Sequence, residues 1–183
     1  IPPARCEHTF AFVQKSQRRL MEYFADVYSG KFSSPNLAVR ASHLLSAGIA
    51  EVVYQADQVP VIWARDGAGK LFGLTYKRDS DLSSQPPSVM AWHQHTHGGG
   101  RTFQSLVVGP AASGGTESLA AITSDGSRYY VEVLGNVFQE TDTAATAAFL
   151  DAAVVPSYAF SNDGSSAVLS GLWSLEGKTR SEE

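Results

Sequence analysis

The sequence has little cysteine, no clustered positive charge and no long apolar run. Only one of its 183 residues is cysteine, so neither a disulfide nor a cysteine metal cluster can form within the chain, and Cys6 is expected to be a small buried hydrophobe. Its 14 lysine and arginine residues are dispersed among 18 acidic ones, which argues against a surface that grips nucleic acid or membrane lipid. No apolar stretch approaches the roughly 20 residues of a membrane span.

What is present is the material for a folded core. Hydrophobic residues make up 43% of the chain and aromatic residues 10%, which argues against disorder. The chain starts at Ile1 rather than at methionine and ends in a polar run at 178–183. We therefore expect it to be a processed or excised part of a larger protein.

The first part of the chain, residues 1–34, is expected to form a hairpin and a loop. Apolar residues alternate over 8–16 and again over 20–28, and a polar turn separates the two runs. This period of two predicts a pair of antiparallel strands, although the second run is also compatible with a short helix.

The spacing of apolar residues changes in the unit 35–48. Leu37, Ala41, Leu44 and Leu45 recur at helical intervals, and Gly48 stands where a C-terminal cap belongs. These features predict one short helix over about 36–47. His43 lies within it and is expected to be an ordinary surface or packing residue.

The period of two returns over 49–134 and predicts two blade-like antiparallel units. The expected strands of the first unit, about 49–97, are 49–55, 59–65, 71–78 and 89–95; those of the second, about 101–134, are 102–108, 117–123 and 128–134. The fold class is therefore mainly β, with antiparallel hairpins forming propeller-like blades. Residues 135–183 are expected to be an extended C-terminal segment, and whether 143–153 is helical stays open.

Three histidines form the sharpest local feature. His93, His95 and His97 are two residues apart, so in a strand they share one face, where three imidazoles suit zinc or nickel. However, same-face neighbours on one strand lie ~7 Å apart, which strains coordination of a single ion. We favour a histidine-rich strand end, and assign no metal ligand and no cofactor.

Other candidate sites have simpler structural interpretations. The glycines before Arg101 could suggest a phosphate loop, but no helix follows them, so a hairpin loop is favoured. No nucleophile motif is present, and we assign no catalytic residue. Several aspartates stand in turn sequences, and the tryptophans, which could line a sugar site, are expected to be core. The aspartates are Asp57, Asp66, Asp79, Asp81 and Asp125, and the tryptophans are Trp63, Trp92 and Trp173.

A series of short motifs runs through the chain. They are V-I-W-A-R-D-G at 61–67, L-F-G-L-T-Y-K-R at 71–78, A-W-H-Q-H at 91–95, A-F-L-D at 148–151 and S-G-L-W-S-L-E-G-K-T at 170–179. In this order they resemble the tail tubular, or nozzle, proteins of short-tailed bacteriophages. The similarity extends from about His8 to Thr179. Ser174, where that family commonly has histidine, departs from its pattern, and His97 and the triple glycine look like local variation.

The resemblance implies structural work in a virion. Such proteins form a ring, usually a hexamer, at the distal end of the phage tail tube, with propeller-like platform regions, and they contact other tail proteins such as the adaptor ring and tail fibres. Viral DNA passes through the channel without specific binding, which suits a net charge of −4. On this interpretation the W-H-x-H strand is a packing element.

Two alternative functions remain at the level of sequence. One is a carbohydrate- or receptor-binding β-propeller module that uses the tryptophans. The other is a metalloenzyme that uses His93, His95 and His97.

Overall fold

The computed structural model describes residues 1–26, 30–57, 59–78, 89–97, 100–111 and 116–134. Within them the chain forms three sheets, each built from consecutive antiparallel strands. The prediction of a mainly β fold made of antiparallel hairpins is confirmed. The expected C-terminal segment 135–183, including the open question at 143–153, lies outside the described residues.

The N-terminal sheet has four strands in the order β1-β2-β3-β4. The strands are β1 (Ala4–Cys6), β2 (Thr9–Val13), β3 (Leu20–Asp26) and β4 (Lys31–Ser33). The expected hairpin corresponds to β2 and β3, and the second run is a strand, not a helix. The sequence analysis missed β1 and β4, which are three residues long and too short to show a period.

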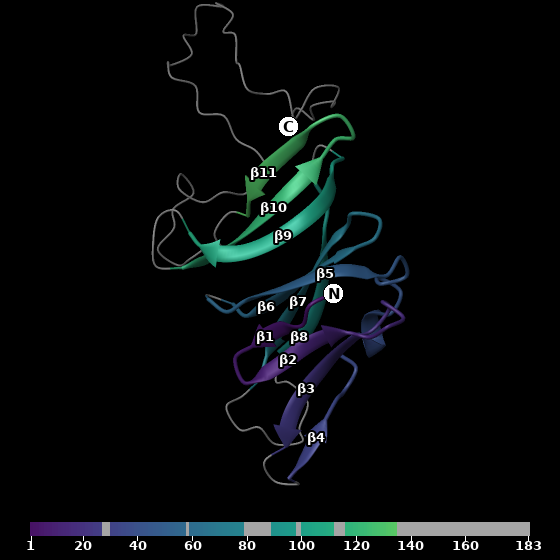
Figure 1. Cartoon of the computed structure of the whole chain (residues 1–183), viewed down its shortest axis with the longest axis vertical. Coiled ribbons are helices and arrows are strands. Elements are labelled where there is room, and N and C mark those ends of the chain that lie inside the picture. The colour runs from purple at the N-terminus through teal and green to yellow at the C-terminus, as the bar shows by residue number, and fades with distance from the viewer. Residues whose placement is uncertain (27–29, 58, 79–88, 98–99, 112–115, 135–183) are drawn as a thin grey trace, which may run out of the picture.

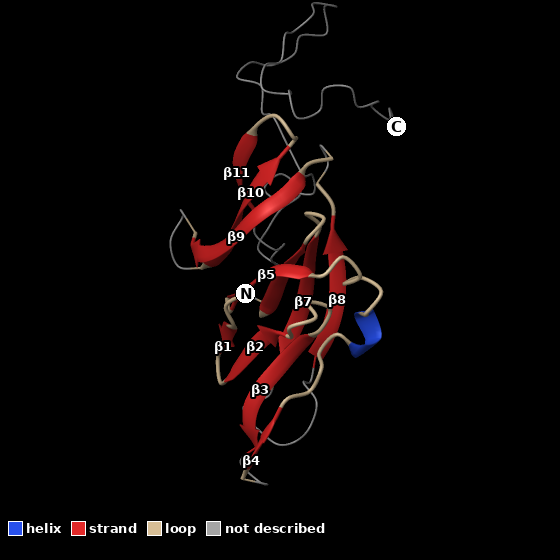
Figure 2. Cartoon of the chain, turned by 45° about the vertical axis from the view of Figure 1, so that its right-hand side comes forward, coloured by secondary structure: helices blue, strands red, loops and turns tan. Residues whose placement is uncertain are grey.

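The other two sheets correspond to the two expected units. The central sheet has the order β5-β6-β7-β8 and the third sheet the order β11-β10-β9. Their strands are β5 (Ile49–Gln55), β6 (Val61–Asp66), β7 (Leu71–Lys77), β8 (Val89–His95), β9 (Thr102–Pro110), β10 (Glu117–Ser124) and β11 (Tyr129–Val133). The three sheets follow one another along the long axis of the described structure, with the central sheet in the middle (Figures 1 and 2).

The expected three-turn helix over 36–47 is not formed. Its place is taken by a single 3-10 turn, η1 (Val39–Ala41), and further tight turns. Their backbone bonds span three residues, as from the Leu44 amide to the Ala41 carbonyl at 3.0 Å. Backbone bonds at 2.8 Å from the Leu37 amide to the Leu20 carbonyl and at 2.6 Å from the Ile49 amide to the Gln17 carbonyl attach the two ends of the segment to β3 and to the turn before it. Gly48 does end the segment, with a left-handed φ of 81°.

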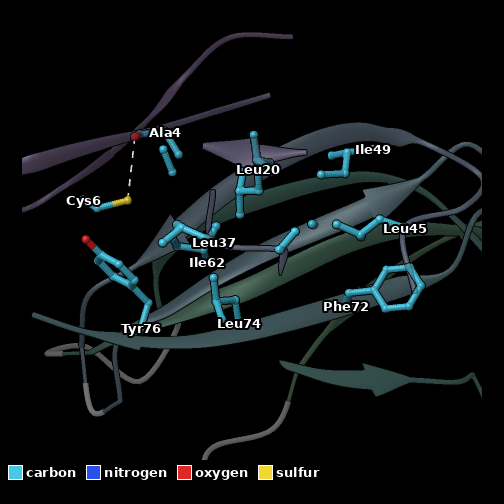
Figure 3. Packing of buried hydrophobic residues seen from close by; sticks show 14 residues of the cluster. Ala4, Cys6, Leu20, Leu37, Leu45, Ile49, Ile62, Phe72, Leu74 and Tyr76 are labelled. Atoms are coloured by element: carbon cyan, nitrogen blue, oxygen red, sulfur yellow. Dashed lines mark hydrogen bonds between the residues drawn. The ribbon is translucent and has the colours of Figure 1, made fainter. Parts of the chain in front are cut away.

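The two inner strands of the central sheet, β6 and β7, are buried on both faces. One face joins the N-terminal sheet and the turns after it in the first core, which includes Leu20, Leu37, Ile62, Phe72 and Leu74 (Figure 3). The other face joins the third sheet in the second core, whose buried members are Val61, Trp63, Leu71, Leu106, Leu119 and Ala121. Because successive residues of a strand point to opposite faces, residues 61–64 of β6 are apolar and buried without alternation.

Leu74 offers a direct test of the first core. Its side chain has no exposed surface, so Leu74→Ala should lower the free energy of unfolding by about 2–5 kcal/mol through lost burial and the cavity left behind. The matched control is Val39→Ala, because Val39 is 66% exposed and should change stability by no more than about 0.5 kcal/mol. Urea denaturation measures both variants, and equal effects would contradict the assigned core.

Candidate functional site

The motif residues of the central sheet meet in one row across three strands. Gly73 on β7 lies opposite Trp63 on β6 and opposite His93 on β8. A Cβ atom on Gly73 would lie 2.0 Å from Cε1 of His93, so the missing side chain is what lets the imidazole lie over the strand. The indole of Trp63 meets that ring edge-on, with centroids 5.7 Å apart.

His93 and His95 lie together, as strand periodicity predicts. Nδ1 of His93 and Nε2 of His95 are 2.7 Å apart, and Nε2 of His93 lies 3.3 Å from the Thr75 hydroxyl. The bond between the imidazoles occupies two nitrogens that would otherwise be available to a metal ion. Burial first, and the neighbouring His95 second, hold the pKa of His93 below its ordinary value, so the ring is neutral in the fold near pH 7.

His97 is separated from the other two histidines. Its Nε2 lies 3.0 Å from a carboxylate oxygen of Glu132 on β11, because the chain has left β8 at His95. Among the described residues, no group of three or more His, Cys, Asp or Glu side chains is arranged to hold a metal ion. The structure therefore does not assemble the three-histidine site.

Glu132 collects several partners inside the third sheet. It accepts hydrogen bonds from Arg101 at 2.5 Å and from the Thr123 hydroxyl at 2.7 Å, besides its contact with His97. Burial would raise the pKa of Glu132, but the bonds from Thr123 and His97 outweigh it and hold the pKa below its usual value. Arg101 also lies over the Tyr130 ring, 3.7 Å from its centroid. Arg101 therefore joins Glu132 and Tyr130 of the third sheet. Residues 98–99 lie outside the described residues.

The tryptophans serve packing in the described part of the chain. Trp63 is only 4% exposed within the second core, and its indole N–H donates to Gln55 at 2.9 Å. The Trp92 indole N–H donates to the Leu37 carbonyl at 3.0 Å, which ties β8 to the turn segment. Trp63 therefore has no exposed ring face for a sugar to stack on, and Trp92 is half-buried against the first core. Trp173 lies outside the described residues.

Three of the five aspartates can be placed. Asp66 caps its turn by accepting from the amides of Ala68 and Lys70 at 2.9 and 2.8 Å, as expected. Asp125 likewise accepts from its own turn and from the Tyr130 hydroxyl, and these bonds lower the pKa of Asp125 to about 2. Asp57 instead contacts the third sheet, as described below. Asp79 and Asp81 lie outside the described residues.

A polar network joins the N-terminal sheet to the central sheet. Glu22 has no exposed surface, and its carboxylate accepts two hydrogen bonds from Arg78, each 2.7 Å long, and one from the Tyr76 hydroxyl. That hydroxyl also lies 3.2 Å from Thr9, and the Arg78 guanidinium sits 4.1 Å from the centroid of the Phe24 ring. The buried charge of Glu22 is therefore paired and hydrogen-bonded, as burial requires.

Carboxylates also join the central sheet to the third sheet. Glu51 on β5 accepts from the Ser105 hydroxyl at 3.2 Å and from the Leu106 amide at 3.1 Å. Asp57 and Glu117 each bind the backbone of the other's segment. The Asp57 carboxylate accepts from the Glu117 amide at 3.0 Å, and the Glu117 carboxylate accepts from the Ala56 amide at 2.6 Å. These contacts fix how the two sheets sit on each other.

A cavity of about 430 Å³ lies beside the first of these joints, lined in part by Cys6, Tyr54 and Tyr76. Burial raises the pKa of the Cys6 thiol to about 12 and raises the pKa of both tyrosines. The thiol is therefore protonated at neutral pH, unlike the thiolate that a cysteine nucleophile needs. As expected, Cys6 is a buried member of the first core, with its thiol 3.7 Å from the Ala4 carbonyl oxygen (Figure 3).

The sequence analysis did not find the joints between sheets. One signal for them was available in β3. Glu22 lies between Leu20 and Phe24 on the same buried, otherwise apolar face of the strand, and a charge on a buried face needs a partner. No sequence signal identified Arg78 as that partner, since 56 positions separate the two residues.

No protein-family model and no curated protein matches the chain. In the described residues, no helix is long and apolar enough to cross a membrane.

The row at Gly73 predicts a stability defect with a specific rescue. Gly73→Ala forces a methyl group against His93 and should cost about 1–3 kcal/mol through overpacking. In a double-mutant cycle with His93→Ala, removal of the imidazole should recover part of that loss. The control is Gly109→Ala, also within a strand, where an added Cβ meets nothing within 4 Å. If the stability changes of the two substitutions simply add, the close approach of His93 to position 73 is contradicted.

His93 also predicts a dependence of stability on pH. The pKa of His93 is lowered in the fold, so as pH falls through about 6.5 the unfolded chain takes up a proton that the folded chain resists. The free energy of unfolding should therefore fall between about pH 7.5 and pH 5.5. His93→Gln should flatten this slope, whereas His43→Gln, at an exposed position, should leave it unchanged. Equal slopes in all three proteins would refute the assignment.

Proposed function

We propose that the chain is a structural component of a phage tail, part of a ring-shaped tail tube or nozzle that conducts DNA during ejection. The supporting observation is that Trp63, Gly73 and His93 meet in one packed row. These residues belong to the motifs by which the sequence resembles the nozzle proteins. Residues that recur in a motif and serve packing suit a protein whose work is mechanical.

The way the sheets are joined is consistent with this role. Each joint combines an apolar core with buried or half-buried carboxylates that bind the neighbouring sheet. Such contacts resist sliding of one sheet over the next, because sliding would leave a charge without its partners. A wall of a conduit under load needs that resistance.

The proposed partners follow from the same role. The chain assembles with copies of itself into a ring, a hexamer on the family pattern, and contacts other tail proteins such as the adaptor ring and tail fibres in the virion. Viral DNA passes without specific binding, and a net charge of −4 suits a channel that does not retain phosphates. The burial of Trp63 gives no support to the carbohydrate-binding alternative. The separation of His97 from His93 and His95 gives none to the metalloenzyme alternative.

Electron microscopy of the purified full chain tests the proposal, together with sedimentation analysis of the same sample. We expect closed rings with a central opening, and no retention of DNA at physiological salt. Elemental analysis of the sample serves as the control for the metalloenzyme alternative. A chain that stays monomeric at all concentrations, or one that carries a stoichiometric metal ion lost on His95→Ala, would contradict the proposal.

A further inference from the structure

An open cleft of about 590 Å³ lies where the turn between β2 and β3 meets the turns of 36–47. Its polar lining consists of two guanidinium groups, two hydroxyls and one side-chain amide. These groups belong to Arg18, Arg19, Ser42, Ser46 and Asn36. All of them donate hydrogen bonds, and no lining residue is acidic. The lining therefore suits a ligand that is negatively charged and rich in acceptor atoms.

The two segments that form the cleft carry positive charge and no negative charge. Residues 14–19 and 34–48 include Lys15, Arg18, Arg19 and Arg40 but no aspartate or glutamate. The chain as a whole has a net charge of −4, so this part of the surface is opposite in sign to the average. The cations are dispersed in the sequence, and only the fold brings the two segments together.

Arg18 and Arg19 differ from the arginines that hold the fold. Arg65, Arg78 and Arg101 each pair with a glutamate, whereas no carboxylate among the described residues pairs with Arg18 or Arg19. Two neighbouring guanidinium groups repel each other, and an anion bound between them removes that repulsion. Both arginines are therefore available to a ligand and gain from binding one.

Backbone hydrogen bonds hold both sides of the cleft in place. The turn that carries the arginines is closed by a bond from the Gln14 amide to the Arg19 carbonyl at 3.0 Å. On the opposite side Oδ1 of Asn36 accepts from the Ala38 amide at 2.9 Å, which leaves the Asn36 amide nitrogen as a donor. A ligand that enters a cleft held in this way does not have to order its backbone.

We propose that this cleft, the arginine cleft, binds a phosphate group, either free or at the end of a small organic molecule. A phosphate monoester carries about two negative charges and three acceptor oxygens, which matches two guanidinium groups and the neutral donors beside them. The guanidinium fork also fits the geometry of phosphate. A single carboxylate offers one charge and two oxygens. Ala38 and Val39, which complete the lining, provide an apolar contact for the carbon part of an organic phosphate.

The arginine cleft lacks the features of a nucleic-acid surface. No aromatic side chain lines it, so a base has nothing to stack on. Contact with a duplex takes cations spread along a face, whereas the lining contains only Arg18 and Arg19. The inference goes beyond the proposed tail function and does not rest on it.

Isothermal titration calorimetry of the full chain with glycerol 3-phosphate tests the site, at an ionic strength kept constant with sodium chloride. We expect saturable binding of one ligand per chain, tighter than the binding of acetate. Arg18→Gln/Arg19→Gln should lower the affinity about tenfold or more, because hydrogen bonds between charged groups are lost. The matched control is Arg5→Gln/Arg128→Gln, which removes the same charge at exposed positions outside the cleft and should leave the affinity unchanged.

Two further measurements separate the geometry of the site from its charge and from folding. Arg19→Lys keeps the charge but loses the planar fork, so it should also weaken binding. The arginines that are replaced are exposed, so the melting temperature without ligand should be the same in all variants. Glycerol 3-phosphate should raise it in the unmodified chain and in the control, but not in Arg18→Gln/Arg19→Gln.

Inorganic phosphate and a short DNA duplex, titrated in the same way, identify the source of the phosphate group. Inorganic phosphate bound as tightly as glycerol 3-phosphate would support the site and assign free phosphate as its ligand. Equal losses in the two double variants, or binding that never saturates, would show a general attraction to charge and overturn the inference. A duplex bound more tightly than glycerol 3-phosphate, and lost with both arginines, would overturn it in favour of a nucleic-acid surface. Neither calorimetry nor melting depends on ring assembly, so the proposed function stands or fails separately.

Discussion

Burial of both faces of the inner strands of the central sheet is the constraint on which the rest of the structure depends. Apolar side chains leave β6 alternately toward the two cores, with Ile62 on one side and Trp63 on the other. A sheet of this composition is stable only when a layer covers each side. The N-terminal and third sheets are those layers, and neither could be removed without exposing a core.

Apolar burial holds the sheets together, but it does not fix their relative orientation. That task falls to carboxylates: Glu22 reaches the central sheet, Glu51 reaches β9, and Asp57 and Glu117 bind each other's strands. A buried or half-buried carboxylate tolerates only geometries that keep its hydrogen bonds. The described part of the chain is thus a stack whose joints are directional, which suits the mechanical role that we propose.

The motif residues illustrate how one sequence pattern can suggest chemistry and serve packing. Two neighbouring imidazoles beside an indole resemble the start of a metal or sugar site. In the fold one imidazole fills the space that Gly73 leaves open, the second binds the first, and His97 contacts the third sheet. These contacts are packing and hydrogen-bonding contacts among the described residues.

The sequence by itself determined the strands other than β1 and β4, the D-G turns and the shared face of His93 and His95, because alternation and turn chemistry are local properties. The helix predicted over 36–47 is wrong, since the same apolar spacing fits a chain of tight turns when its two ends are attached to the β2–β3 hairpin. Nor could the sequence place His97 beside Glu132, 35 positions away, or pair Glu22 with Arg78. Only the tertiary structure decided those contacts, because they depend on how whole sheets stack.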